Sequence, residues 1–212
     1  GLANTLSSST AVTIGSGAIF ARGSFAQSIG SLSGSGNTTG TALLTVGNDN
    51  TSTTYSGVMS GTGGGLTKVG TGTLTLSGAN SYTGATTISA GTLALSGGGT
   101  ISSSSGVSAT GTFDISGGTS GSSITTLSGS GGVNLGANTL TLTAASGSYS
   151  GVMSGTGGLT LSSGTQTLSG ANTYTGATTI SGGTLTAGLA NTLSSSTAVT
   201  IGSGAIFARG SF

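Results

Sequence analysis

The residues that could carry chemistry are few. Among 212 residues the chain has no histidine, cysteine, glutamate or tryptophan, and its charged side chains are Arg22, Asp49, Lys68, Asp114 and Arg209. Hydrolase or lyase chemistry needs paired carboxylates, or a carboxylate beside a cation or metal. Asp49 and Asp114 lie far apart in the sequence, and serine without a base is not activated. The composition predicts that the chain is not an enzyme and has no catalytic, cofactor or metal site.

The charged residues are expected to be structural or solubilising. Asn48-Asp49-Asn50 could be read as a calcium loop, but one carboxylate is too little for a calcium cage, and these residue types favour turns. We therefore predict a turn. Asp114 lies in the strand-like stretch GTFDISG and is expected to face solvent. Lys68 and Arg22 are expected to be exposed charges that keep the chain soluble.

Charge also limits the partners. Three scattered cations cannot replace the counterions of a nucleic acid or form a polybasic membrane site. The apolar runs are short, so we expect no membrane insertion of this segment. The glycine, serine and threonine content raises the alternative of disorder. Disordered chains usually combine low hydrophobicity with many charges and prolines, whereas this chain has no proline and places its apolar residues in regular patterns.

Two sets of polar side chains suggest binding. The pairs Thr73/Thr75, Thr139/Thr141 and Thr165/Thr167 would suit an ice-binding face, but they do not recur at every repeat and threonine is a good strand residue. Tyr82 and Tyr174 could form an aromatic platform for a sugar. We favour a structural role, with each ring packed at a corner and its hydroxyl in water.

Alternating strands must position all these residues. Leu74-Thr75-Leu76 and Leu140-Thr141-Leu142 alternate apolar and polar residues, as half-buried strands do, and glycine, serine and asparagine separate such runs. Glycine-led motifs begin at positions 72, 91, 111 and 132, and again at 164, 183 and 204. This spacing of roughly 19–21 residues indicates one coil of a β-solenoid. The wider gap from Gly132 to Gly164 could hold two short coils or one long coil.

A much longer repeat contains these coils. Residues 1–25, GLANTLSSSTAVTIGSGAIFARGSF, recur letter for letter at 188–212. We interpret 1–212 as one continuous solenoid segment: 1–187 is a full tandem unit and 188–212 starts the next. Within the unit, 55–93 resembles 149–185, so one half-unit spans about 55–148 and the next begins at position 149. One unit would hold nine or ten coils.

The remaining composition suits continuous stacking. Proline would remove a donor from a ladder that must continue on both sides, and a charge repeated in every coil would repel its neighbours about 4.8 Å away. The larger apolar residues are expected to fill the core; these are Phe20, Phe25, Phe113, Met59 and Met153.

Residues 65–93, GLTKVGTGTLTLSGANSYTGATTISAGTL, resemble the passenger-associated repeat of autotransporter proteins. Residues 158–185 are a second copy that lacks the lysine and one glycine-rich turn. The resemblance implies an all-β fold without helices, a right-handed parallel β-helix. It also implies export to the surface of a Gram-negative-type bacterium, anchored in the outer membrane through a domain outside this segment.

The leading hypothesis is a structural and adhesive extracellular fibre shaft, with neighbouring units joined end to end and with lateral self-association or surface attachment. A second hypothesis is an adhesin module that recognises one glycan or receptor, with residues 96–135 as the place where a binding loop would depart from the repeat. A third makes the chain a discrete subunit whose identical ends exchange strands between molecules.

Overall fold

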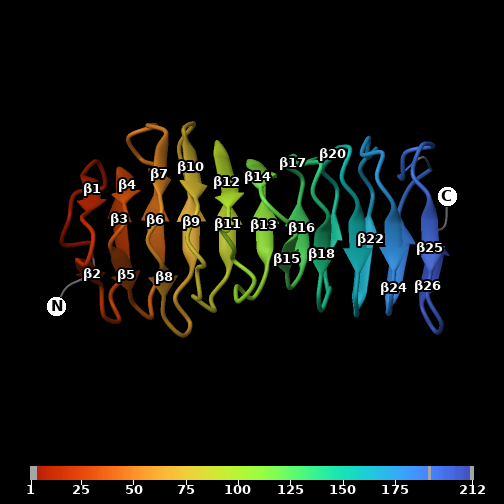
Figure 1. The fold of residues 1–212 in the computed structure, drawn as a ribbon, viewed down its shortest axis with the longest axis horizontal. Helices are drawn as coiled ribbons and strands as arrows, with labels where there is room; N and C mark the ends of the chain where they lie inside the picture. The colour runs from red at the N-terminus through yellow and green to blue at the C-terminus, as the bar shows by residue number, and fades with distance from the viewer. Residues whose placement is uncertain (1–3, 191, 211–212) are drawn as a thin grey trace.

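In a computed structural model the chain forms an elongated rod of stacked coils, with its two ends at opposite tips (Figure 1). The structure describes residues 4–190 and 192–210. Residues 1–3, 191, 211 and 212, which belong to the predicted unit ends, lie outside the described residues. The described residues contain strands and no helix, and all their strand pairs are parallel. No described residue belongs to a helix that could span a membrane.

Each coil contributes strands to three faces, named here in the order in which the chain visits them. The first face is an eight-stranded sheet of β1 (Ala11–Ile14), β4 (Ser31–Gly34), β7 (Thr53–Tyr55), β10 (Thr73–Leu76), β12 (Thr92–Gly97), β14 (Thr112–Gly118), β17 (Val133–Gly136) and β20 (Met153–Gly155).

The second face has a three-stranded sheet of β2 (Ile19–Ala21), β5 (Asn37–Thr39) and β8 (Met59–Ser60). Further along the rod it has a five-stranded sheet of β15 (Ser122–Ile124), β18 (Leu140–Leu142), β21 (Leu159–Leu161), β23 (Thr178–Ile180) and β25 (Val199–Ile201). Between these sheets this face is irregular, with the single bridge Ala79–Thr100.

The third face is a ten-stranded sheet that runs along almost the whole rod. Its strands are β3 (Gln27–Ile29), β6 (Leu44–Val46), β9 (Leu66–Lys68), β11 (Thr86–Ile88), β13 (Val107–Ala109), β16 (Leu127–Gly129), β19 (Ser148–Tyr149), β22 (Thr165–Leu168), β24 (Thr184–Ala187) and β26 (Ile206–Arg209).

The coil length varies more than the motif spacing predicts. Two residues that pair across neighbouring strands lie one coil apart, and the coil from Gln27 to Leu44 is clearly shorter than the next one, from Leu44 to Leu66. The predicted length of roughly 19–21 residues per coil lies between these two. Corners absorb the difference, because a loop between strands can change length without altering the ladder.

The core is built from files of side chains that stack from coil to coil. On the first face, Leu74, Leu93, Phe113, Val133 and Met153 follow one another in register. All five are almost fully buried, and so is Met59. The predicted alternation in Leu74-Thr75-Leu76 and Leu140-Thr141-Leu142 is confirmed, with each leucine buried and each threonine half-exposed.

The other two predicted core phenylalanines lie near the N-terminal end. Phe20 is half-buried and packs against the core. Phe25 is also half-buried, but it lies in the corner between β2 and β3 and is not part of the core, which corrects the prediction for that residue. Phe25 lies outside the strands whose inward side chains form the core files.

Glycine is required where successive coils approach closely. A Cβ added to Gly57 would overlap the carbonyl oxygen of Gly36, and one added to Gly151 would overlap that of Gly131. Real Cβ atoms do not approach a backbone oxygen so closely. These positions therefore admit only glycine at the coil spacing that the sheets impose.

The number of coils in a unit follows from the faces. Strand β2 on the second face and strand β26 on the third carry the same sequence, one tandem unit apart. From β2 the chain passes to β3 on the next face, and the ten strands from β3 to β26 make nine steps. One unit is therefore nine coils and one face, about nine and one third coils, which explains why the sequence allows both nine and ten.

The two half-units are likewise offset by a number of coils that is not whole. Strand β9 on the third face and its counterpart β21 on the second face are separated by four steps of the ten-stranded sheet and two faces. The wide gap before Gly164 has the same cause: β20 lies one coil after β17 on the first face, and β22 lies on the third face. The gap is neither two short coils nor one long coil, because the motif moves to a different face.

Candidate functional site

Arg22 is not the exposed charge that the sequence predicts. Its side chain is buried, its Nε donates a hydrogen bond to Thr38 Oγ1 (3.2 Å), and its Nη1 donates to the carbonyl oxygen of Ala42 (2.8 Å). Burial lowers the pKa of the guanidinium group, and the nearby Tyr55 opposes this shift. The guanidinium satisfies polar groups of the next coil, so its role is to join two coils.

Lys68 is buried as well, which corrects the second exposed charge. It ends β9 in an inward file between Val46 and Ile88, and its Nζ donates to the carbonyl oxygens of Val69 (2.5 Å) and Gly70 (3.0 Å). Burial lowers the pKa of this amine, and Asp49 acts in the opposite direction. A long side chain at a corner can reach carbonyls that the ladder leaves free, which residue type alone does not reveal.

The two carboxylates serve the backbone. Asp49 lies in the predicted turn, and its Oδ1 accepts hydrogen bonds from the backbone N–H (2.9 Å) and the hydroxyl (2.8 Å) of Thr51. Partial burial alone would raise the pKa of Asp49, but these hydrogen bonds hold it below its usual value. Asp114 lies in an outward file, half-buried, and accepts from the N–H of Ser116 (2.8 Å).

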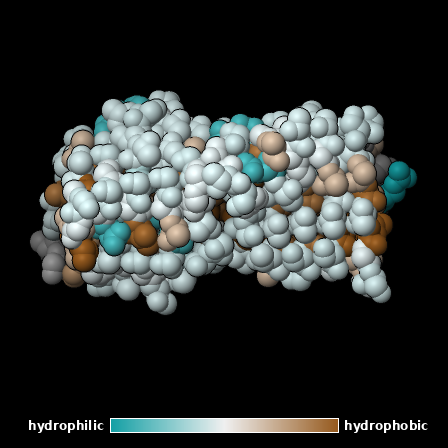
Figure 2. All heavy atoms as spheres, in the orientation of Figure 1, coloured by the Kyte–Doolittle hydropathy of each residue, from teal (hydrophilic) through white to brown (hydrophobic). Residues whose placement is uncertain are grey.

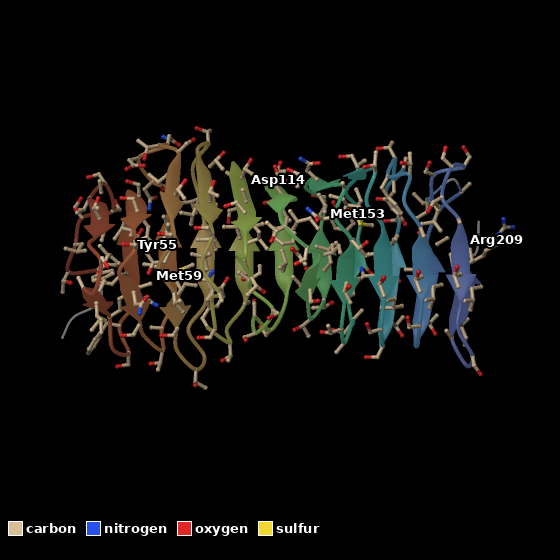
Figure 3. All side chains as sticks on the ribbon, viewed as in Figure 1. Tyr55, Met59, Asp114, Met153 and Arg209 are labelled. Carbon is tan, nitrogen blue, oxygen red and sulfur yellow. The ribbon has the colours of Figure 1, made fainter. Side chains whose placement is uncertain are left out.

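Within residues 4–190 and 192–210, no three histidine, cysteine or acidic side chains are grouped as metal ligands. Figure 3 shows Asp114 on the flank of the rod and Arg209 at its C-terminal tip. Four of the five charged side chains make hydrogen bonds within the solenoid; these are Arg22, Lys68, Asp49 and Asp114.

The tyrosines are core residues with internal hydrogen bonds. Tyr82 and Tyr174 are buried, and their hydroxyls lie 2.7 and 2.6 Å from the hydroxyls of Thr86 and Thr178. The predicted wet hydroxyl is therefore wrong, because a threonine of the same coil supplies a partner in the interior. Burial raises the pKa of both groups. Neither ring is available as a platform for a sugar.

Two buried asparagines support the corners that hold these tyrosines. They belong to the sequence motif that resembles the passenger-associated repeat, but no role was predicted for them. Asn80 Oδ1 accepts from the N–H of Met59 (2.9 Å), and its Nδ2 donates to the carbonyl oxygens of Gly78 (2.9 Å) and Thr100 (3.1 Å). Asn172 makes the equivalent bonds, to Met153, Gly170 and Thr192. Each asparagine thus links three successive coils. Its recurrence in both half-units was the available signal.

Comparison with protein-family models finds one match. The passenger-associated-transport-repeat model matches residues 66–95 and 162–187. The chain carries two passenger-associated-transport repeats. The first match contains β10 on the first face, whereas the second match contains the equivalent strand β22 on the third face, so the two repeats are turned relative to each other around the rod. No curated protein and no solved structure matches the chain significantly.

The outer surface of the third face carries a regular file of hydroxyl side chains, which we call the hydroxyl ladder. It runs outward along the third face in nine successive coils, and β26 continues it with Ala208. Its members are Ser28, Thr45, Thr67, Thr87, Ser108, Ser128, Ser148, Thr167 and Thr186. Each hydroxyl can both donate and accept a hydrogen bond. The ladder is uncharged, and the visible side of the rod has mostly intermediate hydropathy (Figure 2).

The predicted threonine pairs do not form one array. Thr73/Thr75 lie on the first face and Thr165/Thr167 on the third, while Thr141 lies on the second, with Thr139 just before its strand. The turning of the half-units separates them around the rod. They do not make the two-file surface that the ice-binding interpretation requires.

In the region 96–135, where the adhesin-module hypothesis places a departing loop, the structure differs from the regular coil in its strands. Strands β12 and β14 are the longest of the described strands, and their register shifts between Ala94 and Ser96. A cavity of about 240 Å³ lies beside this shift, lined by glycines 97–99 and 121 and by small hydroxyl residues, among them Thr100, Ser102 and Ser120. No aromatic or charged side chain lines it.

Proposed function

We propose that this chain is a stretch of the shaft of an adhesive bacterial surface fibre, exported as part of an autotransporter passenger. The observation that carries the proposal is the uninterrupted parallel stacking of the third face, combined with the recurrence of residues 1–25 at 188–212. A stack that continues through identical units lengthens without creating a new exposed edge. The two passenger-associated-transport repeats support export to the cell surface.

The hydroxyl ladder supports self-association. Charge repulsion normally keeps protein surfaces apart, and this ladder contains no charged residue over nine coils. Serine and threonine hydroxyls are self-complementary, because each both donates and accepts. Lateral bundling of shafts, or attachment to hydroxyl-bearing surfaces, follows from this chemistry. The proposal assigns no catalytic residue and no cofactor.

Electron microscopy of the native protein tests the shaft. We expect filaments as wide as one coil, alone or in bundles, whereas isolated globules would refute the proposal. Bundling is tested by Thr45→Asp with Thr87→Asp, two ladder positions separated by one coil so that the new charges do not lie in adjacent strands. We expect single filaments with unchanged circular dichroism, while Thr45→Ser with Thr87→Ser should still bundle.

A second candidate function is recognition of one glycan or receptor, and the cavity beside the register shift favours it. Its hydroxyls and backbone groups could bind a sugar by hydrogen bonds, although it lacks an aromatic ring. A glycan array with the intact chain tests this candidate. One selective hit that Ser102→Val with Ser120→Val abolishes would support it, and equal binding to uncoated plastic would contradict it.

A further inference from the structure

The cavity beside the register shift lies at the corner between the first and second faces, and we call it the corner cavity. Residues 97–100 and 102 line it on one side, and residues 120–123 of the next coil line it on the other. Glycines and the hydroxyl side chains of serine and threonine form this lining. Its volume of about 240 Å³ is below that of most cavities that hold a drug-sized ligand, so it suits a smaller polar molecule.

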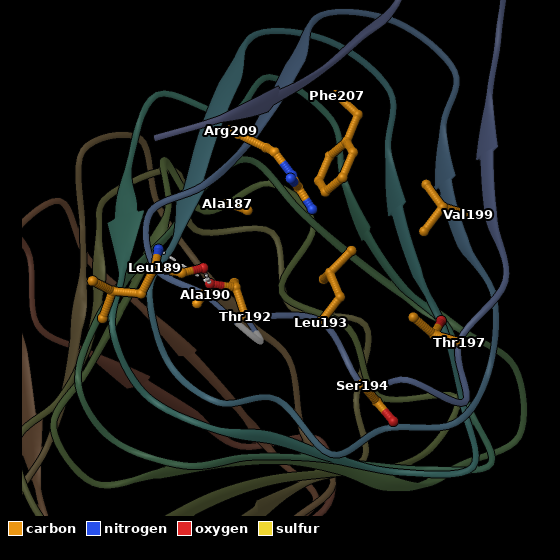
Figure 4. A pocket seen from close by; sticks show the side chains of 10 residues that line it. All are labelled: Ala187, Leu189, Ala190, Thr192, Leu193, Ser194, Thr197, Val199, Phe207 and Arg209. Atoms are coloured by element: carbon orange, nitrogen blue, oxygen red, sulfur yellow. Dashed lines mark hydrogen bonds between the residues drawn. The ribbon is translucent and has the colours of Figure 1, made fainter. Parts of the chain in front are cut away.

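A larger cavity, of about 340 Å³, opens at the C-terminal tip of the rod, with Phe207 and Arg209 in its lining (Figure 4). It is not a comparable site. The coil of residues 5–25 has the same sequence as this tip, and there the next coil covers it through Thr38 and Ala42. In a tandem shaft a following coil would cover the tip in the same way. The corner cavity, by contrast, lies between two coils within the unit.

In the first half-unit a glutamine side chain crosses the place that corresponds to the corner cavity. Gln27 and Ser122 occupy equivalent positions, because the similar sequences SIGSLSGSG and SITTLSGSG directly follow them. The same offset makes Thr5 equivalent to Thr100. Gln27 is buried, and the hydroxyl of Thr5 donates to its Oε1 (3.5 Å) from the preceding coil. The glutamine amide therefore spans the two coils that the cavity separates in the second half-unit.

Ser122 is too short to span this gap. It is only 7% exposed, and its hydroxyl makes no hydrogen bond within residues 4–190 and 192–210. Its oxygen is not completely enclosed, because Ser122 lines the corner cavity. On the other side, Thr100 Oγ1 accepts from the N–H of Ser102 (3.2 Å) and keeps its own proton to donate. A hydroxyl without a partner in the interior is costly, so a ligand that supplies one gains affinity.

The corner keeps its connection to the next coil by a different residue in each half-unit. In the first, Arg22 reaches forward to the carbonyl oxygen of Ala42 (2.8 Å). In the second, a glycine is equivalent to the arginine, and Asn138 is equivalent to Ala42. Asn138 Nδ2 reaches back to the carbonyl oxygens of Ile115 (2.8 Å) and Gly118 (3.1 Å). The corner is thus held in place without a large side chain in the cavity.

We propose that the corner cavity binds one neutral sugar residue of a glycan, with the hydroxyls of Thr100 and Ser122 as hydrogen-bond partners. This inference rests on the second candidate function, glycan recognition, and names its ligand class and the residue that opens the site. Sugar hydroxyls both donate and accept, as the lining hydroxyls do. An acidic sugar lacks a cation here, because the nearest charged residue in the sequence is the carboxylate Asp114.

The affinity of one such site should be low. A single sugar residue has few atoms, and without an aromatic ring beneath it we expect a dissociation constant on the order of 1 mM. The tandem repeat compensates for this weakness. Each unit carries one corner cavity, so several weak sites on one shaft can bind the same glycan-coated surface together.

Nuclear magnetic resonance of the intact chain tests the site, with the methyl glycosides of glucose, mannose, galactose and N-acetylglucosamine as probes. We expect at least one probe to shift the amide resonances of residues 97–102 and 120–123, with a dissociation constant on the order of 1 mM. Methyl glucuronide, the acidic analogue of the glucoside, should leave them unchanged.

Three variants assign the binding to the cavity. Ser122→Gln installs the residue of the first half-unit, and it should fill the cavity, reach Thr100 and abolish the shifts with unchanged circular dichroism. Ser122→Ala removes only the hydroxyl and should weaken binding about two- to tenfold. The matched control is Thr141→Gln, on the outward side of the next strand of the same sheet, which should bind as the unchanged chain does.

The inference is overturned if none of the four neutral glycosides shifts these resonances, or if the shifts persist in Ser122→Gln. A response to methyl glucuronide as large as that to the neutral glycosides would also overturn it. The site and the shaft fail separately. Filaments that bind none of the probes would overturn this inference alone, whereas sugar binding in the cavity of a chain that forms no filaments would support it and refute the shaft.

Discussion

Gln166 offers a sharp test of the reasoning about the core. It is fully buried in β22, and its Nε2 donates to the carbonyl oxygens of Leu127 (3.0 Å) and Thr167 (3.2 Å). Its Oε1 is the one buried side-chain atom of the described residues that lacks a hydrogen-bond partner. The equivalent residue of the first half-unit is Leu74, also buried. The same inward position thus holds an amide in one half-unit and an aliphatic group in the other.

We expect Gln166→Leu to stabilise the fold. An unsatisfied buried polar group costs about 1–3 kcal/mol, and the substitution removes this cost. The substitution also removes two hydrogen bonds, and each loss destabilises the fold by about 0.5–1.5 kcal/mol. Burial of the leucine adds about 1.5–3 kcal/mol. At mid-range the first two contributions cancel, which leaves the leucine burial as a net gain of about 1.5–3 kcal/mol. The reverse change, Leu74→Gln, loses leucine burial and adds an unsatisfied amide, so it should destabilise by about 3–5 kcal/mol.

Urea denaturation followed by circular dichroism measures both variants, and the midpoint is compared at unchanged slope. A lower midpoint for Gln166→Leu would refute the reasoning, because it would mean that Oε1 has a partner and that the amide belongs to a satisfied polar network. Gln166→Asn, which keeps the amide but shortens the side chain, is the control for shape.

Three further predictions use other buried groups. Lys68→Leu, which installs the residue found at Leu161, should raise stability most at neutral pH. The lowered pKa of Lys68 destabilises the folded chain below that pKa and ceases to do so as pH rises towards 10.5, so the variant should lose this pH dependence in urea titrations. The buried tyrosine hydroxyls have the opposite effect at alkaline pH. Burial raises the pKa of Tyr55 to about 12, so the free energy of unfolding should fall by roughly 2 kcal/mol between pH 10 and 12. In Tyr55→Phe the free energy of unfolding should fall less over this range. Gly57→Ala should prevent folding or cost more than about 4 kcal/mol, because its Cβ meets Gly36 O, whereas Gly98→Ala, with open space around its Cβ, should change the thermal midpoint little.

The fold could be predicted because it depends on patterns along the chain. Alternation of the Leu74-Thr75-Leu76 type makes half-buried strands, and the regular return of the glycine-led motifs makes coils. The tandem identity of 1–25 and 188–212 adds the long period. These features survive changes in corner length, since the ladder pairs strands and not corners. The β-solenoid was predicted from these patterns, whereas the passenger-associated repeat and the parallel β-helix were implied by the resemblance of residues 65–93.

The interior polar contacts could not be predicted in the same way. Whether Lys68 or Arg22 lies inside depends on which carbonyls a corner leaves free, and a pattern of residue types does not contain that information. The hydroxyl of Tyr82 is likewise buried because Thr86 lies within the same coil. The face occupied by each motif was also hidden, because motif spacing counts residues whereas the structure advances by thirds of a coil.

The central claim is a continuous solenoid whose units turn by one face. Electron cryomicroscopy of three tandem units tests it most directly. The account predicts one unbroken rod with a spacing of about 4.8 Å along its axis and a rise of about 45 Å per tandem unit of nine and one third coils. Successive units should be related by a rotation of one face, so that the same view returns only after three units, about 134 Å. Separate globules, or units that superpose by translation without rotation, would contradict the account.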